Sequence, residues 1–413
     1  MKTVLYISYD GMTDNLGQSQ VIPYLVGLSK LHYTIHLLSC EKPQVYEQKK
    51  QDIEKLLKKN NITWHAIAYT ATPPVVSTLY DIKQLQKKAS EIVKTHAVDF
   101  VHCRSYIAAQ VGVCLHRKYH LPWIFDMRGF WADERIDGGI WNTKKLLYRT
   151  IYKHFKRLEK KYIATAQHIV TLTEAGKKEM LSWGIFKHCN TPISVIPCCA
   201  DLEHFDFRRI SPQKKQTVRK ELGIADTTFV LSYLGSFGTW YMNHEMFDFF
   251  AQLRRRHADS CFLCITPDDP ETLYNQAEQY NIPRTALRIV KASRAEVPLY
   301  AGISNWSLFF IKPLYSKIAS SPTKMGELLA LGIPLVCNSG VGDVEEIMKH
   351  CPQGVCVHDF SHETYHNAIE EMLQNPSPNA EPLHIVAQQF YSLAQGVKLY
   401  AGIYEAVESA AGK

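Results

Sequence analysis

The stretch SSPTKMGELLALGIPLV, residues 320–336, is the part of the sequence that decides the fold. Pro322 suits the first position of a helix, Ser321 can cap that helix, and Gly332 can end it. The apolar run that follows, from Pro334 onward, has the length of a buried strand. A short helix that leads at once into a short buried strand is typical of a parallel α/β sheet.

The same alternation of short apolar runs and longer amphipathic stretches extends outward over the whole chain. The alternation forms two successive series of strand and helix patterns with a break between them. This predicts two doubly wound, Rossmann-like α/β domains. The predicted strands are 4–8, 35–39, 100–102, 123–127, 168–172 and 193–196 in the first series, and 229–234, 261–265, 287–290, 308–311 and 334–337 in the second.

Polar and charged residues interrupt the pattern near 201–211, and we place the domain boundary there. The prediction is an N-terminal domain over 1–205, a C-terminal domain over 206–390, and a C-terminal helix over 391–413. The helical pattern of about 383–410 predicts that this helix packs back across both domains. Two such sheets present the carboxyl ends of their strands to a central cleft, where ligands bind.

The 413 residues have an ordinary globular composition, 46% hydrophobic and 21% charged. The formal net charge of +7 is concentrated in residues 144–161, which hold eight Lys or Arg and one Glu. The remainder is about neutral, which argues against nucleic-acid binding and favours one local anionic partner.

Apolar residues recur on one helical face of this basic segment. One interpretation is a surface helix with a solvated basic face. The other is peripheral docking to an anionic membrane or to a lipid that carries a diphosphate. The residues of the apolar face are Leu147, Ile151, Phe155, Leu158 and Tyr162.

The 11 cysteines show no disulfide framework, which is typical of a reducing cytoplasm. The CFLC run at 261–264 has zinc-ligand spacing, but no second pair follows at metal-site spacing, so we interpret it as buried strand thiols. No apolar run reaches the ~20 residues that cross a bilayer. We therefore expect a cytoplasmic protein, which could also lie at the inner face of the membrane.

Two strand-to-helix turns are rich in glycine. Gly11 and Gly17 follow the first predicted strand, and Gly235 and Gly238 follow the strand that opens the second series. Such turns let a phosphate approach backbone N–H groups. Neither turn matches G-x-G-x-x-G or a P-loop, so a turn without a ligand remains an alternative for the first one.

Lys324 and Glu327 are three residues apart and share one face of the predicted helix. They form either a simple surface ion pair or a binding site. In the second interpretation Glu327 bonds the ribose hydroxyls, and Lys324 with the helix start binds a diphosphate.

The stretch SPTKMGELLALGIPLVCNSGVGDVEEI, residues 321–347, resembles the nucleotide-binding motif of glycosyltransferase family 4, bacterial type, whose members have the GT-B fold. The resemblance covers the whole chain and implies retaining transfer from a nucleotide-diphosphate sugar to a glycan or lipid-linked acceptor, with no cofactor and no bound metal. Further similar stretches are ISYDGMTDNLGQSQVIPYL, DFVHCRSYIAA, FDMRGFWADE, VTLTEAGKKEM, VIPCCADLEHF and YLGSFGTWYMNHEM.

The predicted donor site combines this motif with the glycine turns. Its residues are Gly17, Gly235, Ser236, Lys312, Ser321, Pro322, Thr323 and Glu327.

Two departures from the family pattern concern the donor site. Many members carry a glutamate eight residues before the one that Glu327 matches, and this chain has Ala319 there. Many members also carry an Arg and a Lys after the glycine that corresponds to Gly235. In this chain Ser236 occupies the position of that Arg, and no Lys follows nearby. The cation that steadies the leaving diphosphate must then come from elsewhere, and Lys324 and then Lys312 are the candidates.

Polar residues at strand ends of the first domain are expected to point into the cleft. His102 and Arg128 join Lys324 as predicted catalytic residues, and Arg104 as an acceptor-side residue. Asp133 and Glu134 could orient an acceptor hydroxyl, with helix capping as the alternative.

Charge supplied by the protein can stabilise the leaving diphosphate without a metal. We interpret the Asp268–Asp269 pair as a helix start rather than a metal site. No nucleophile with a paired base stands out. We therefore expect the mechanism that the resemblance implies, front-face departure, in which the leaving phosphate itself deprotonates the acceptor hydroxyl. The alternatives are a GT-B nucleotide-sugar epimerase and a non-catalytic nucleotide-sugar-binding subunit.

Overall fold

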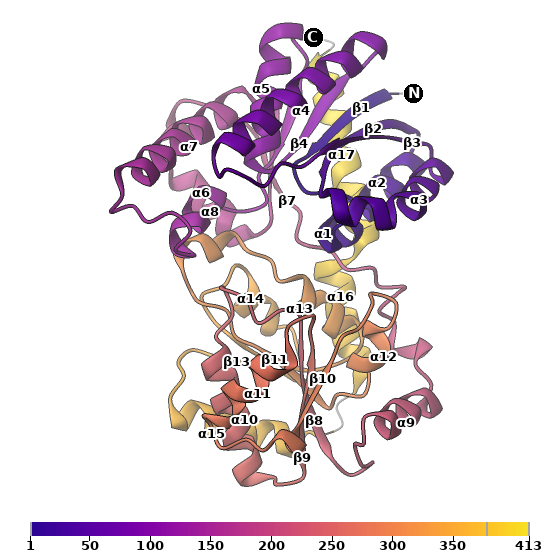
Figure 1. Ribbon diagram of the computed structural model, residues 1–413, viewed down its shortest axis with the longest axis vertical. Coiled ribbons are helices and arrows are strands. Elements are labelled where there is room, and N and C mark those ends of the chain that lie inside the picture. The colour runs from indigo at the N-terminus through magenta and orange to yellow at the C-terminus, as the bar shows by residue number, and fades with distance from the viewer. Residues whose placement is uncertain (1, 377–378, 412–413) are drawn as a thin grey trace. The chain divides into compact units, whose positions relative to one another are not determined.

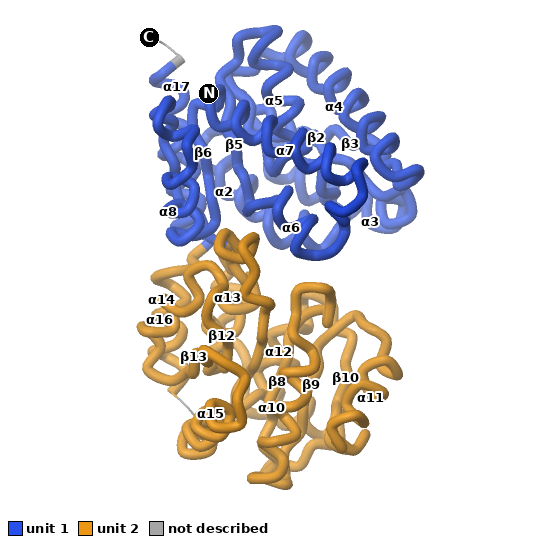
Figure 2. Tube along the Cα trace, turned by 90° about the vertical axis from the view of Figure 1, so that its left-hand side faces the viewer, with its two compact units in different colours: residues 1–197, 393–413 blue, residues 198–392 orange. Residues whose placement is uncertain are grey.

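The computed structural model describes residues 2–376 and 379–411. The chain forms two compact units (Figure 2). Unit 1 comprises residues 1–197 and 393–413, and unit 2 comprises residues 198–392.

The boundary between the units lies before the predicted one at residue 205. Phe205 is buried in the core of unit 2, and Ala200 forms a parallel bridge with Ser392 of the same unit. The residues on either side of the predicted boundary therefore belong to one hydrophobic core.

Unit 1 is built on a seven-stranded parallel sheet of order β3-β2-β1-β4-β5-β6-β7. Val4 of β1 lies beside Ile35 of β2 and Phe100 of β4, and all three are fully buried. Burial on both faces explains why these strands read as continuous apolar runs. The strands are β1 (Lys2–Ser8), β2 (Tyr33–Glu41), β3 (Ile62–Ala68), β4 (Phe100–Arg104), β5 (Trp123–Asp126), β6 (His168–Thr171) and β7 (Ile193–Val195).

Helices cover both faces of this sheet. On one face α4, α5 and α7 lie side by side, and on the other α17 packs against α2 (Figures 1 and 2). The helices are α1 (Asn15–Gln20), α2 (Ile22–Lys30), α3 (Pro43–Lys59), α4 (Val76–Thr95), α5 (Ser105–Tyr119), α6 (Trp131–Asp137), α7 (Leu146–Thr165), α8 (Glu174–Ser182) and α17 (Leu393–Ala411), with a 3₁₀ turn at Gly184–Lys187.

Unit 2 repeats the architecture with a six-stranded parallel sheet of order β10-β9-β8-β11-β12-β13. Its strands are β8 (Phe229–Leu234), β9 (Ser260–Ile265), β10 (Leu287–Val290), β11 (Trp306–Phe309), β12 (Leu335–Asn338) and β13 (Val355–Val357). Its helices are α9 (Pro212–Glu221), α10 (Asn243–Arg256), α11 (Pro270–Glu278), α12 (Val297–Ala301), α13 (Thr323–Ala330), α14 (Val344–Met348), α15 (His362–Gln374) and α16 (Ala380–Tyr391), with 3₁₀ turns at Phe207–Arg209, Arg284–Ala286 and Tyr315–Ala319.

The predicted single helix over about 383–410 is wrong. The structure has two helices there, because Ser392 adopts an extended backbone conformation and pairs with Ala200. The break leaves α16 in unit 2 and α17 in unit 1, where Tyr400 and Tyr404 are buried.

Each sheet has one point at which the strand order reverses, between β1 and β4 in unit 1 and between β8 and β11 in unit 2. In open parallel sheets ligands bind outside the carboxyl ends of the strands at such a reversal. The turns after β1 and β8 are the two glycine-rich turns singled out from the sequence.

Candidate active site

Helix α13 carries the motif that decided the fold, and the structure places its start close to the reversal in unit 2. Pro322 occupies the position before the first helical residue, Thr323. Ser321 does not cap the helix as predicted; its hydroxyl instead accepts a hydrogen bond from the backbone N–H of Cys198 at 3.2 Å. Gly332 follows the helix with a φ of 66°, as expected for its C-terminal end.

Lys324 lies beneath the turn that follows β8. Its Nζ is 4.1 Å from the ring centre of Tyr233 and 3.9 Å from that of Tyr241. A Cβ placed on Gly235, whose φ is 114°, would come within 3.1 Å of the same nitrogen. The backbone conformation therefore favours glycine at this position, and the lysine nitrogen lies directly below it.

The side chain of Lys324 is only 7% exposed, and Nζ has no hydrogen-bond partner among the described residues. Burial lowers the pKa of this ammonium well below its usual value, with a small opposing effect from Glu327. No ion pair joins Lys324 to Glu327 in the described part of the chain, so the surface-pair interpretation is wrong. A buried cation without an acceptor is the feature that an anionic ligand would satisfy.

The turn from Gly235 to Tyr241 is held by its own sheet. The Tyr233 hydroxyl donates to the carbonyl of Ser236 at 2.6 Å, and Asp268 accepts from the backbone N–H of Phe237. The neighbouring Asp269 caps α11 by accepting from Thr272 N at 2.9 Å, which confirms the predicted helix start.

Glu327 is buried on the same helix, 8% exposed, and pairs with Arg294 at 3.1 Å. Burial raises the pKa of this carboxyl, and the guanidinium of Arg294 opposes the rise. His204 also lowers the pKa of Glu327 slightly, and its Nε2–H donates a hydrogen bond to the backbone carbonyl of Arg294 at 2.9 Å. Sequence reasoning missed Arg294, because it lies in a loop after β10 with no motif around it.

The other predicted donor residues lie around this centre. Ser236 is exposed in the turn after β8, and Thr323 is half-buried at the start of α13. Lys312 is exposed just after β11, and its backbone N–H donates to the carbonyl of Trp240 at 2.9 Å. Lys312 therefore lies beside the same turn, while Lys324 lies beneath it.

The first glycine turn belongs to unit 1 and is tightly packed. A Cβ on Gly17 would lie 2.2 Å from the carbonyl oxygen of Gly11. The buried carboxylate of Glu41 holds the turn by accepting from Met12 N at 2.7 Å and from the Thr13 hydroxyl at 2.7 Å. Glu41 was not found from the sequence, since a glutamate at the end of an apolar strand gives no signal of its partner.

His102 does not suit the predicted catalytic role. It is 1% exposed, and both ring nitrogens have partners in unit 1: the Tyr404 hydroxyl at 2.8 Å and Asp126 at 3.3 Å. Burial lowers the pKa of the imidazole, and Asp126 opposes the change. We therefore assign His102 to the anchoring of α17, together with the 2.9 Å bond from Tyr400 to Asp126.

Two predicted cations lie at the carboxyl edge of the unit 1 sheet. Arg104, the last residue of β4, is 4% exposed, and its Nε is 3.5 Å from Asp10. Arg128 follows β5 with a φ of 55° and reaches Gln20 of α1 at 3.5 Å. Both side chains thus remain candidates at the edge where the first glycine turn lies.

Asp133 is engaged inside unit 1, contrary to the predicted acceptor-side role. It is 6% exposed, accepts from the Tyr152 hydroxyl at 2.7 Å and pairs with Lys156 at 3.0 Å. These contacts fasten α6 to α7. Glu134, the next residue of α6, is half-buried.

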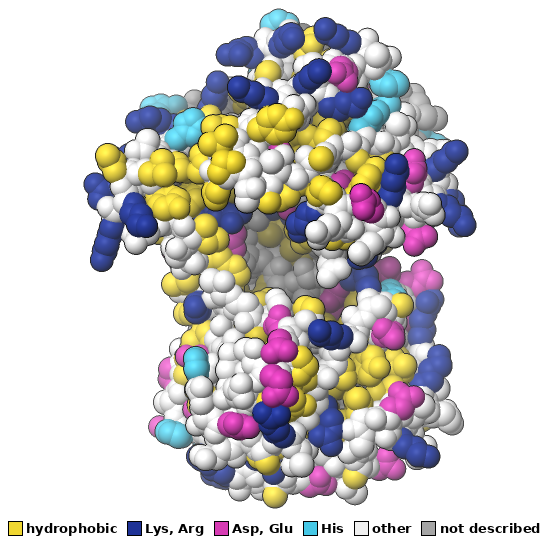
Figure 3. All heavy atoms as spheres, in the orientation of Figure 1, with side chains coloured by type: hydrophobic (Ala, Val, Ile, Leu, Met, Phe, Trp, Pro, Cys, Tyr) yellow, Lys and Arg dark blue, Asp and Glu magenta, His cyan; other side chains and the backbone are white. Residues whose placement is uncertain are grey.

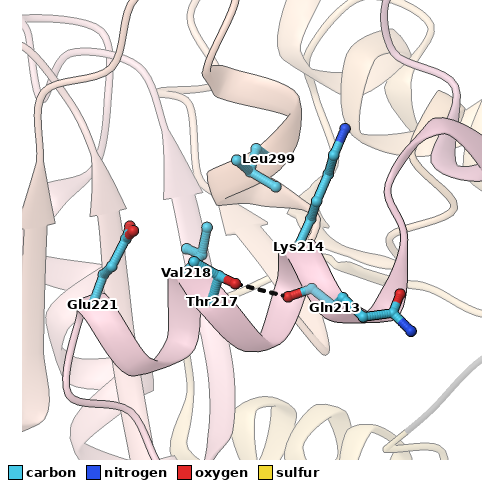
Figure 4. Close-up of a pocket in the computed structure, with 6 residues that line it drawn as sticks. All are labelled: Gln213, Lys214, Thr217, Val218, Glu221 and Leu299. Carbon is cyan, nitrogen blue, oxygen red and sulfur yellow. Dashed lines mark hydrogen bonds between the residues drawn. The ribbon is translucent and has the colours of Figure 1, made fainter.

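One pocket of unit 2 lies away from this site. It has a volume of about 210 Å³ and is lined by α9 and Leu299, and its side chains include none of the predicted site residues (Figure 4). Within residues 2–376 and 379–411, no three His, Cys, Asp or Glu side chains are grouped so as to hold a metal ion. No helix in the described part of the chain combines the length and apolar character needed to cross a bilayer.

Two Rossmann-like sheets, with a buried lysine and a glutamate at the reversal point of the second, define a glycosyltransferase of the GT-B class. The family model described as Glycosyltransferase Family 4 matches residues 24–204, and the one described as Glycosyl transferases group 1 matches residues 214–388. The chain belongs to the family 4 type of glycosyltransferases, and it is a glycosyl-transfer enzyme.

Solved structures with low sequence identity share the fold. Anabaena HepE (Alr3699), in complex with UDP and glucose, aligns with a TM-score of 0.68 at 13% identity, over 98% of this chain and 100% of that one. Sucrose-phosphate synthase from Thermosynechococcus elongatus aligns with a TM-score of 0.72 at 12% identity, over 99% and 100%. WaaG, a glycosyltransferase involved in lipopolysaccharide biosynthesis, gives 0.61 at 14% identity, over 99% and 98%. A search of curated proteins finds no match to the sequence.

Proposed function

We propose that this enzyme transfers a sugar from a nucleotide-diphosphate sugar to a glycan or lipid-linked acceptor, with retention of configuration and without a bound metal. The observation that carries the proposal is the buried Lys324, which lies without a hydrogen-bond partner beneath the turn after β8 and one helical turn from Glu327. UDP and UDP-glucose are the ligands named for HepE, which supports this class of donor.

The leaving diphosphate gains negative charge as its bond to the sugar breaks. The ammonium of the buried Lys324 and the N–H groups at the start of α13 oppose that charge. Lys312 supplies a second, exposed cation next to the same turn. Glu327, oriented by Arg294, accepts hydrogen bonds from the ribose hydroxyls.

Unit 1 supplies the acceptor side in this proposal. Arg104 and Arg128 lie at the carboxyl edge of its sheet and suit a phosphate or another acidic group on the acceptor. The basic segment 144–161 makes peripheral contact with an anionic membrane. We place the enzyme in the cytoplasm at the inner face of that membrane, where it takes part in the synthesis of a bacterial surface polysaccharide.

The donor assignment is tested first by a thermal-shift screen over nucleotide sugars, because a ligand that binds the native state raises its melting temperature. Glu327→Ala is then expected to weaken binding of the selected donor by about 1.5–3 kcal/mol, on the order of ten- to a hundredfold in Kd. Titration calorimetry measures the change, with Glu346→Ala as the matched control because Glu346 is an exposed carboxylate on α14.

Unchanged donor affinity in Glu327→Ala would refute the ribose assignment. Transfer itself is measured as release of the nucleoside diphosphate, which is expected only when an acceptor is present. An epimerised donor in the absence of acceptor would instead establish the epimerase alternative.

A further inference from the structure

Two tyrosine rings lie together where β1 and β3 end. Tyr9 follows β1 and Tyr69 follows β3, and their ring centres are 5.6 Å apart with an angle of 63° between the ring planes. Both side chains are half-buried, so each keeps part of its surface open to solvent. The carboxyl ends of parallel strands share one edge of a sheet, and the pair therefore lies at the edge that also carries Arg104. The donor site uses neither tyrosine.

Asp81 of α4 holds this pair in a fixed position. Its carboxylate is fully buried and accepts from the Tyr9 hydroxyl at 2.9 Å and from the backbone N–H of Thr70 at 3.1 Å. The backbone N–H of Tyr69 donates to the carbonyl of Glu41 at 2.8 Å. Burial raises the pKa of Tyr9, and the hydrogen bond to Asp81 raises it further. A ligand that binds to rings already fixed in place loses less free energy to their ordering.

Carboxylates converge near the ends of β1 and β2. Burial raises the pKa of the Cys40 thiol on β2, and Asp81, Glu41 and Asp10 raise it further because their negative charges lie nearby. Asp10 is the exposed member of these three: 41% of its side-chain surface is accessible, and its carboxylate lies 3.5 Å from Nε of Arg104. Asp10 can therefore accept hydrogen bonds from a ligand while Arg104 fixes its orientation.

A pocket of about 140 Å³ opens beside the ends of β2 and β3. Among the described residues its lining contains two carboxylates and one tyrosine, and no Lys or Arg; it consists of Glu41, Pro43, Tyr46, Glu47 and residues 66–68. On the face of unit 1 that Figure 3 shows, Asp and Glu side chains lie mainly toward α1 to α3, and hydrophobic side chains gather toward α7. This distribution of charge disfavours a phosphate beside β1 to β3 and favours a ligand with hydroxyl groups.

We propose that the carboxyl ends of β1, β2 and β3 bind a sugar ring of the acceptor. An aromatic ring presents a negative face, which attracts the C–H groups on one side of a sugar ring, and Tyr9 and Tyr69 supply such faces. The carboxylate of Asp10 accepts hydrogen bonds from the sugar hydroxyls. This subsite rests on the proposed transfer reaction and narrows its acceptor to a chain that already ends in a sugar, free or attached to a lipid. A bare lipid phosphate offers neither the ring nor the hydroxyls.

Saturation-transfer-difference NMR on the full-length protein, without donor, tests the subsite directly. The probes are the methyl glycosides of glucose, galactose, mannose and N-acetylglucosamine, and we expect at least one of them to bind. In Tyr69→Leu its dissociation constant should rise roughly two- to tenfold, because the variant keeps apolar surface and loses the ring. Tyr69→Phe keeps the ring and should bind as the wild type does.

Asp10→Asn tests the hydrogen bonds and should weaken glycoside binding roughly two- to tenfold, because an amide oxygen is a weaker acceptor than a carboxylate. Tyr119→Leu is the matched control, because Tyr119 is half-buried at the end of α5, at the opposite edge of the same sheet. Its glycoside binding should equal that of the wild type. The nucleotide sugar selected by the thermal-shift screen should not displace the glycoside, and its own binding should be unchanged in the Tyr69 and Asp10 variants.

The subsite is refuted if none of the four glycosides binds, if Tyr69→Leu and Tyr119→Leu bind equally well, or if the donor displaces the glycoside. Efficient transfer to a polyprenyl phosphate without a sugar would also contradict it. A thermal-shift screen that selects no nucleotide sugar would contradict the donor assignment instead, so that the two failures are distinguishable.

Discussion

Lys324 is a residue whose surroundings set its function. Full burial disfavours the ammonium, while the two tyrosine rings within about 4 Å stabilise it through cation–π interactions. Neither ring could be connected to Lys324 from the sequence, because Tyr233 and Tyr241 flank the glycine turn and reach the lysine only through packing. The rings therefore hold the cation in place until a diphosphate provides a charged partner.

Replacing Tyr241 tests this positioning role. In Tyr241→Leu we expect turnover to fall roughly five- to thirtyfold, which corresponds to the loss of a cation–π interaction of about 1–2 kcal/mol. Tyr241→Phe retains the ring and should retain most of the activity. The measurement is kcat and KM for both variants, with melting temperatures as a check on folding. Equal losses in the two variants would point to the hydroxyl group rather than the ring.

Lys324→Ala separates the two candidate cations. We expect it to lower kcat more than it weakens donor binding, since the charge on the leaving diphosphate grows in the transition state. Lys312→Ala removes an exposed cation beside the same turn and is the matched comparison, with a smaller effect on kcat. Unchanged turnover in Lys324→Ala would move the phosphate role to Lys312 or Arg128.

The middle of helix α13 packs very closely against α16, and this contact fixes the position of the first turn of α13. A Cβ built on Gly326 would be 2.6 Å from the ring of Tyr391, which is itself 1% exposed. The glycine costs helix propensity, and its absence of a side chain makes the close approach possible.

Gly326→Ala is therefore expected to destabilise the protein by about 1–3 kcal/mol, despite the better helix propensity of alanine. Gly402→Ala in α17 is the control, because nothing lies within 4 Å of a Cβ at that exposed position. There the substitution should stabilise by about 0.5–1 kcal/mol. Calorimetric unfolding measures both, and the same sign for the two variants would rule out the packing argument.

Most strands were predictable from the sequence as short apolar runs. The predicted strands 229–234 and 287–290 coincide with β8 and β10. Strand β3 (Ile62–Ala68) was missed because Thr63 and His65 interrupt its apolar run, and β13 (Val355–Val357) was missed because Gly354 and His358 leave only three apolar residues between them. The break at Ser392 depends on a bridge to residue 200, which no local pattern reveals.

The site was predictable where a motif places its residues on one helix, and not where distant segments meet. Lys324 and Glu327 were found because three residues separate them in a helix. Arg294 and Glu41 were not found, since their partners lie 33 and 28–29 residues away along the chain. His102 was misjudged because a strand-end histidine gives no sign that a C-terminal helix covers it.

At the scale of the whole molecule, the histidines that burial affects are unevenly placed. Burial lowers the pKa values of His36, His65, His102 and His168, and all four belong to unit 1. His36 and His65 are 3.1 Å apart on β2 and β3, and the ring of His96 lies tilted beside that of His36 with 4.1 Å between ring centres. Protons taken up at these neighbouring imidazoles would therefore repel one another. His168 bonds to Ser194 at 2.8 Å. Unit 1 should therefore be the more acid-sensitive half of the enzyme.

The direction of this pH dependence follows from linkage. The unfolded chain binds protons at these imidazoles below about pH 6.5, whereas His65 and His168 in the folded state do so only near pH 4. These histidines therefore do not reduce the free energy of unfolding above about pH 6.5. As the pH decreases from there toward 4, the free energy of unfolding falls, by roughly 1–2 kcal/mol for each of these two histidines at about pH 5.

Calorimetry at about pH 7 and about pH 5 should show a drop in melting temperature that is smaller in His168→Gln than in the wild type, because the variant has lost one of the titrating groups. His188→Gln is the matched control, since His188 is exposed in the same unit. That control should lose as much stability on acidification as the wild type does. If His168→Gln also loses as much, the buried imidazole does not contribute to the acid sensitivity, and carboxyl groups must account for it.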